Sequence, residues 1–120
     1  MNFPFKDYEY ASIISNLLDN AFESPFKPNQ KTKMVKLIIN EDENNLYLEV
    51  YNNGNPIPAE NLSKIFKKGF STKTNKSDHG FGLYNVKKIT TKYGGSVELL
   101  YKDDFIIFRI MFNKDKILSP

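Results

Sequence analysis

The chain of 120 residues has no cysteine and no long apolar run. The absence of cysteine excludes disulfides and cysteine-ligated metal sites. A chain without disulfides is typical of a reducing compartment. The absence of a long apolar run excludes a membrane-spanning segment, so we expect no direct insertion of this chain into a membrane. The stretch from Asn2 to Tyr10 also lacks the apolar core of a signal peptide.

Arginine and histidine are nearly absent, with Arg109 and His79 the sole examples. Lysine therefore supplies most of the net charge of +3 and the pI near 9.0. Nucleic-acid-binding domains usually carry arginine-rich or aromatic-interleaved basic patches. The lysines are better explained as solvated surface or as flanks of a phosphate site, and no nucleic-acid partner is expected.

The length corresponds to one domain, residues 1–120. Helical spacing of Ala11, Ile14, Leu18 and Ala21 predicts a first helix over 7–24, which Pro25 ends. The remaining pattern predicts strands at 33–40, 46–52, 96–101 and 105–112, a short helix at 59–66, a loop at 67–80 and a helix at 81–93. This order predicts an α+β fold, a two-layer α/β sandwich with a mixed, mostly antiparallel sheet and helices on one face.

The first helix carries polar side chains beside its apolar stripe. Asn16 and Asn20 lie one turn apart, and Glu23 falls close to the same line. Amide oxygens suit Mg²⁺, which takes few protein ligands and keeps several waters. The alternative is two ordinary surface asparagines, although asparagine is a poor helix former.

Three other segments contain residues typical of a nucleotide site. After the second strand, Asn52 can pair with an adenine, Gly54 lets the backbone come close to a flat ligand, and Ile57 can cover the ring. A simple asparagine-glycine turn explains the same residues. Phe70, Ser71, Thr72 and Lys73 lie in the 67–80 loop, and Gly80 and Gly82 precede a helix whose free amides attract anions.

Together, the four segments NLLDNAFES (16–24), NNGNPIP (52–58), IFKKGFSTK (65–73) and HGFGL (79–83) resemble known motifs. They are similar to the N box, first glycine box, F box and second glycine box of one ATP-binding domain. Gyrase, the ninety-kilodalton heat-shock chaperones, sensor histidine kinases and mismatch-repair ATPases share that domain. The resemblance covers Tyr8 to Phe112 and looks closest to histidine kinases, in particular peptide-pheromone receptor kinases of the accessory-gene-regulator type, which act in quorum sensing.

The resemblance implies ATP and Mg²⁺ as cofactors, with Asn20 as the metal ligand and Asn16 and Lys73 as catalytic residues. The implied nucleotide-binding residues are Asn16, Asn20, Glu23, Asn52, Gly54, Ile57, Phe70, Ser71, Thr72, Lys73, His79, Gly80, Phe81, Gly82 and Leu83. The 67–80 loop would be a lid over the γ-phosphate, and the first helix and the glycines near position 81 would face one shared cavity.

Several positions depart from the family pattern. Asn16 replaces the glutamate base of gyrase-like members, and an amide cannot deprotonate water, so efficient hydrolysis is not expected. Asn52 replaces an aspartate, which predicts weaker adenine binding. Pro56 replaces a glycine, and Glu23 replaces a lysine found in many orthodox kinases.

The leading hypothesis is a sensor histidine kinase catalytic domain that phosphorylates a histidine on a separate dimerisation domain. Its other partner would be a response regulator, and it would lie on the cytoplasmic side of the bacterial membrane within a membrane-bound sensor kinase. His79 is not placed to be the acceptor and is expected to be a loop residue or phosphate contact. An anti-sigma-factor type serine kinase, a module that has lost nucleotide and a basic nucleic-acid binder remain as alternatives.

Overall fold

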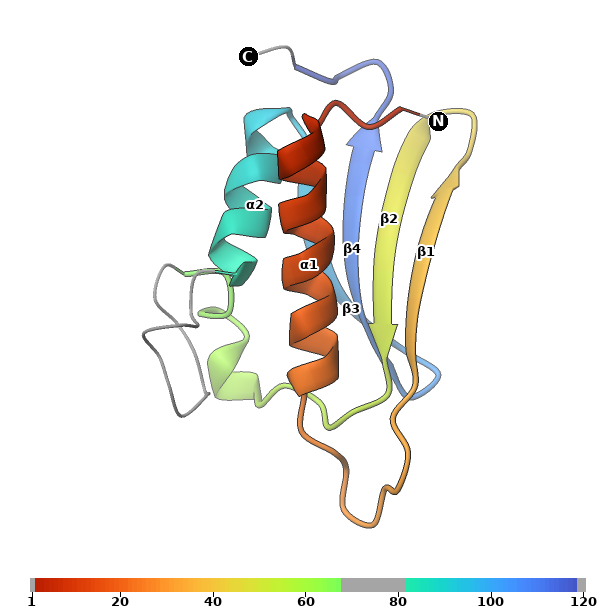
Figure 1. The fold of residues 1–120 in the computed structure, drawn as a ribbon, viewed down its shortest axis with the longest axis vertical. Coiled ribbons are helices and arrows are strands. Elements are labelled where there is room, and N and C mark those ends of the chain that lie inside the picture. Colours follow the sequence, from red (N-terminus) through yellow and green to blue (C-terminus); the bar gives the residue numbers. More distant parts are fainter. Residues whose placement is uncertain (1, 68–81, 119–120) are drawn as a thin grey trace.

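The computed structural model describes residues 2–67 and 82–118. Two helices cover one face of a four-stranded sheet (Figure 1). This is the predicted α+β architecture. In chain order the elements are α1 (Asp7–Glu23), β1 (Val35–Glu41), β2 (Asn45–Asn52), the 3₁₀ helix η1 (Ala59–Asn61), α2 (Gly82–Lys92), β3 (Ser96–Lys102) and β4 (Phe105–Asn113).

The strand order is β1-β2-β4-β3, and each of these pairings is antiparallel. The expectation of a mixed sheet was therefore wrong. A parallel pair would have formed if β3 had lain beside β2 after the connection through α2. Instead β3 lies at the far edge, and the chain turns at Asp103 and Asp104, both with positive φ, so that β4 returns beside β2.

The core lies between the sheet and the helices. Alternate residues of the two central strands face the helices, and α1 packs its own apolar line against them. The buried residues of these three elements are Leu46, Leu48, Val50, Ile106, Phe108, Ile110, Phe112, Ile13, Leu17 and Ala21.

The residues that α1 buries are shifted by about one position from the predicted residues. The helix turns Glu9, Ile13, Leu17 and Ala21 toward the core, whereas Ala11 is exposed. Ile14 and Leu18 are half-buried and pack at the edge of the core. The sequence pattern missed this orientation because it counted no charged residue as buried, and Glu9 is only 3% exposed.

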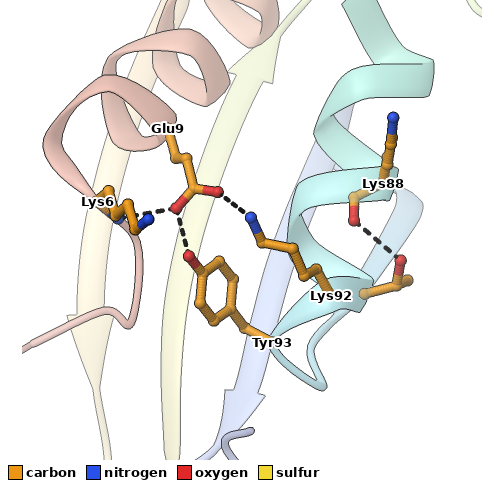
Figure 2. A network of polar contacts seen from close by, with 6 residues as sticks. Lys6, Glu9, Lys88, Lys92 and Tyr93 are labelled. Atoms are coloured by element: carbon orange, nitrogen blue, oxygen red, sulfur yellow. Dashed lines mark hydrogen bonds and ion pairs between the residues drawn. The ribbon is translucent and has the colours of Figure 1, made fainter. Parts of the chain in front are cut away.

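Glu9 joins the start of α1 to the end of α2 (Figure 2). Its carboxylate accepts hydrogen bonds from Lys92 Nζ at 2.5 Å, the Tyr93 hydroxyl at 2.5 Å and the Lys6 backbone N–H at 2.9 Å. Burial by itself raises the pKa of a carboxyl, but these hydrogen bonds outweigh it and lower the pKa of Glu9 to about 2. The Glu9 cluster (Glu9, Lys92 and Tyr93) thus fixes one helix against the other.

The opposite end of α1 is stabilised by Lys33. Its ammonium donates to the carbonyl oxygens of Ala21 at 3.4 Å, Phe22 at 3.1 Å and Ser24. A cation at this position compensates the negative end of the helix dipole and satisfies carbonyls that have no partner within the helix.

The other elements follow the predictions with small changes. The expected short helix at 59–66 is helical only over η1, and turns continue to residue 66. Among the described residues, neither helix is long and apolar enough to cross a membrane.

Candidate nucleotide site

The centre of α1 presents two asparagines toward the start of α2. Asn16 and Asn20 are half-buried, on the flank of the helix away from Ile14 and Leu18. Asn16 Nδ2 donates to Ser12 Oγ at 3.3 Å, one turn earlier. Glu23, in the last turn of α1, is exposed.

Gly82 brings the second glycine segment against this flank. A Cβ on Gly82 would lie 3.2 Å from Asn16 Oδ1 and 3.5 Å from Asn16 Cγ. The first residue of α2 therefore touches the asparagine side chain directly, and a larger residue would crowd it. Leu83, the next residue, is half-buried and packs against the core.

The first glycine segment meets the C-terminal end of α1. Asn52, the last residue of β2, is 1% exposed, and its Oδ1 accepts a hydrogen bond from the Gly54 N–H at 3.0 Å. The Asn55 N–H donates to the Pro25 carbonyl at 2.7 Å. Hydrogen bonds thus hold the turn after β2 against the last residue of β2 and against the segment that follows α1.

Gly54 is required by this packing. A Cβ there would lie 2.5 Å from Ser24 Oγ and 2.7 Å from the Pro25 carbonyl oxygen. We predict that Gly54→Ala lowers the free energy of unfolding by about 1–3 kcal/mol, because the loop must move to relieve the clash. Chemical denaturation measures this, with Asn55→Ala at the exposed neighbouring position as the control. Equal stability of the two variants would contradict the close approach.

A cavity of about 430 Å³ opens on another side of the same loop. It includes Ile57, which the sequence predicted as part of the adenine pocket, but none of the predicted asparagines or glycines. Its lining residues are Lys27, Pro56, Ile57, Ala59, Leu62, Tyr101, Lys102, Asp103, Asp104, Phe105 and Ile106. This cavity is therefore separate from the surface that Asn16 and Gly82 share.

The described residues contain no group of three or more histidine, cysteine, aspartate or glutamate side chains that could hold a metal ion. Asparagine amide oxygens are a different type of ligand that also suits Mg²⁺, which takes few protein ligands. Asn20 carries such an amide and is half-buried one turn beyond Asn16 on the same flank of α1.

Several predicted site residues lie outside the described part of the chain. These are Phe70, Ser71, Thr72, Lys73, His79, Gly80 and Phe81, together with the rest of the predicted lid at 67–80 apart from Lys67. The structure thus brings together Asn16 and Gly82 on one side of α1, and Asn52 and Gly54 near its end.

The sequence interpretation missed three residues that hold these positions. Ser12 is the partner of the Asn16 amide, and its i, i+4 spacing was a usable signal. Ser24 and Pro25 contact the position of a Gly54 Cβ. No sequence pattern pointed to that contact, because it joins segments thirty residues apart.

One known protein family matches most of the chain. The family described as histidine kinase-, DNA gyrase B- and HSP90-like ATPase matches residues 8–114. The chain belongs to this family. The match includes both helices and the sheet, apart from the first residue of α1.

The relatives of this ATPase domain are sensor kinases. Sensor histidine kinase DpiB of Escherichia coli (strain K12) is 36% identical over 92 residues, covering 76% of this chain and 17% of the relative. Sensor histidine kinase CitA of Klebsiella pneumoniae is 34% identical over 89 residues, covering 74% of this chain and 16% of the relative. The chain thus spans about a sixth of the length of these proteins.

A solved structure shares the fold. The nucleotide-free catalytic domain of histidine kinase ThkA superposes with a TM-score of 0.73 at 27% identity, covering 89% of this chain and 67% of that one. The ATPase domain described here is therefore a histidine kinase catalytic domain, the enzyme class that the sequence motifs predicted.

Proposed function

We propose that this domain binds Mg·ATP and donates the γ-phosphoryl group to a histidine on a separate dimerisation domain. The observation that supports it is the contact between Asn16 and Gly82. This contact brings the asparagine flank of α1 against the glycine start of α2, where free backbone amides attract phosphate.

Each residue then has a proposed role. Asn20 would hold Mg²⁺, while Asn16 and the amides around Gly82 would contact the phosphates. Asn52, Gly54 and Ile57 would form the adenine side. Because Asn52 Oδ1 already accepts the Gly54 N–H, the side chain is held in one orientation but has less accepting capacity for adenine.

The predicted lid residues Phe70 to Lys73 and the loop residues His79 to Phe81 would complete the phosphate side, with Lys73 neutralising the transferred charge. Leu83 and Glu23 would border the site. Bound Mg²⁺ would supply neutralisation of the phosphate charge, and the chain itself would contribute positioning and exclusion of water.

Hydrolysis of ATP should be slow. Asn16 carries an amide, whose nitrogen already donates to Ser12, and an amide does not accept a proton from water at neutral pH. Transfer then requires the acceptor histidine, whose ring nitrogen attacks the γ-phosphorus while the bond to the ADP oxygen breaks. We propose that the isolated domain is nearly inactive for this reason.

The wider context is also a proposal. Residues 1–120 would form one domain of a longer sensor kinase, with the dimerisation domain in the same parent chain and a response regulator as the next acceptor. The domain would lie on the cytoplasmic side of the bacterial membrane. The names DpiB and CitA support a sensor kinase and do not support a pheromone receptor. Placement among accessory-gene-regulator type kinases therefore depends only on the similarity of DNAFES, GFSTK and HGFGL.

Calorimetry and phosphotransfer test the proposal together. We expect saturable heat with Mg·ATP, and a phosphorylated product when a histidine-containing dimerisation domain is added. The product should be lost in acid, as phosphohistidine is. An acid-stable phosphoserine on a partner would favour the serine kinase alternative. The absence of heat or thermal shift at millimolar nucleotide would favour a module that has lost nucleotide.

A further inference from the structure

In the edge strand β1, half of the backbone N–H and C=O groups have no neighbouring strand to bond to. The Met34 carbonyl accepts the Asn53 N–H at 3.2 Å, and the Asp42 N–H donates to the Asn45 carbonyl at 3.0 Å. Because hydrogen bonding alternates along an antiparallel strand, the even-numbered residues between them bond to β2. The N–H and C=O groups of Val35, Leu37, Ile39 and Glu41 therefore point away from the sheet.

The same strand exposes large aliphatic side chains on both faces. Leu37 is 40% exposed and Ile39 is 41% exposed on the helix side, and Ile38 is 36% exposed on the opposite side. In the sheet order β1 is terminal, and Figure 1 shows no described element beyond it. Edge strands of this kind readily pair with another strand unless charges or bulges protect them.

We propose that β1 pairs with β1 of a second copy of this chain, antiparallel and centred on Ile38, to form a continuous eight-stranded sheet. In this register Leu37 lies opposite Ile39 of the second copy, and Val35 lies opposite Glu41. These are the residues whose backbone groups point outward, so the donors and acceptors of both copies match. The Glu41 N–H donates to Asn40 Oδ1 at 2.8 Å in the single copy and would exchange this partner for the Val35 carbonyl of the second copy.

The charges along the segment favour this partner and this direction. The residues before β1 and at its start are basic, namely Lys31, Lys33 and Lys36. The end of β1 and the residues after it are acidic, namely Glu41, Asp42 and Glu43. Antiparallel pairing of two copies sets the basic end of each strand beside the acidic end of the other. No two like charges lie directly opposite, since Lys36 faces Asn40 and Lys33 is next to the backbone position of Glu43. Within each copy the Lys33 ammonium stays on the carbonyls at the end of α1, and Glu41 pairs with Lys114 at 2.7 Å.

The helices leave room for the second copy. Helix α1 packs chiefly against β2 rather than β1. The two β2 strands of the pair would be three strand spacings apart, about 14 Å, which exceeds the helix diameter of about 10–12 Å. Leu37 and Ile39 of both copies would then lie between the two α1 helices, with little access to water.

A single cysteine tests the register, since the chain has none of its own. Ile38 lies opposite itself in a non-hydrogen-bonded pair, where Cα atoms are about 4.5 Å apart, within disulfide range. Under mild oxidation Ile38→Cys should form a covalent dimer. Lys36→Cys, on the same face, is the control, because its two copies would lie about 13 Å apart along the strands.

Sedimentation measures the association of the unmodified chain, at concentrations up to about 1 mM because one strand per partner gives a small interface. We expect a reversible dimer that Ile38→Lys returns to monomer while its circular dichroism stays unchanged. A monomer at all concentrations would overturn the proposal. So would equal cross-linking at positions 36 and 38, or a dimer that Ile38→Lys leaves intact.

Discussion

Replacing Asn20 by alanine should lower the affinity of the domain for Mg·ATP by about 100-fold. Asn20 is the half-buried amide one turn beyond Asn16, on the flank of α1 that Gly82 touches. No acidic or histidine cluster in the described part of the chain could replace it as a metal ligand. Titration calorimetry with a non-hydrolysable ATP analogue and Mg²⁺ measures the change.

The control is Ser15→Ala, an exposed position on the same helix. It should bind Mg·ATP as the unchanged chain does, and both variants should unfold at similar temperatures. A second comparison omits the metal: with EDTA the unchanged chain should bind nucleotide no better than Asn20→Ala. Normal binding of Mg·ATP by Asn20→Ala would contradict the proposal that Asn20 is the metal ligand.

Removing the Glu9 carboxylate should destabilise the fold strongly, although Glu9 lies outside the candidate nucleotide site. Glu9→Ala deletes three hydrogen bonds at a position 3% exposed and leaves the Tyr93 hydroxyl without its acceptor. The Lys92 side chain is 43% exposed, so losing its partner lowers the free energy of unfolding by less than breaking a fully buried ion pair would. We expect a loss of about 2–3 kcal/mol, or roughly 10 °C in Tm.

The effect of Glu9 should depend on pH in one direction. Its pKa falls from the ordinary 4.5 to about 2 on folding. A lowered pKa contributes stability that is complete above about pH 5 and is lost as the pH falls toward 2. The difference in unfolding free energy between the unchanged chain and Glu9→Ala should therefore be largest near pH 7 and shrink steadily below pH 5.

Urea denaturation across this pH range measures the difference, with exposed Glu60→Ala as the control. The control should follow the unchanged chain at each pH. A Glu9→Ala difference that stayed constant from pH 7 to pH 2 would show that lost packing, rather than the ionised carboxylate, accounts for the destabilisation.

Local sequence signals predicted most of the elements. Pro25 marked the end of α1, Asp103 and Asp104 marked the last turn, and alternating apolar residues marked β2 and β4. Such features act within a few residues, which is why they can be interpreted without the fold. The short helix after Pro58 was overextended, because its apolar spacing is also compatible with a series of turns.

The sequence alone determined the family of this protein, since four short motifs in a fixed order carry the residue types that a nucleotide site requires. Tertiary structure decided which line of α1 is buried, because only packing shows that Lys92 and Tyr93 satisfy the charge of Glu9. It also decided the all-antiparallel sheet order and the contacts of Gly54 and Gly82. These depend on pairings between residues far apart in the chain, which no local pattern encodes.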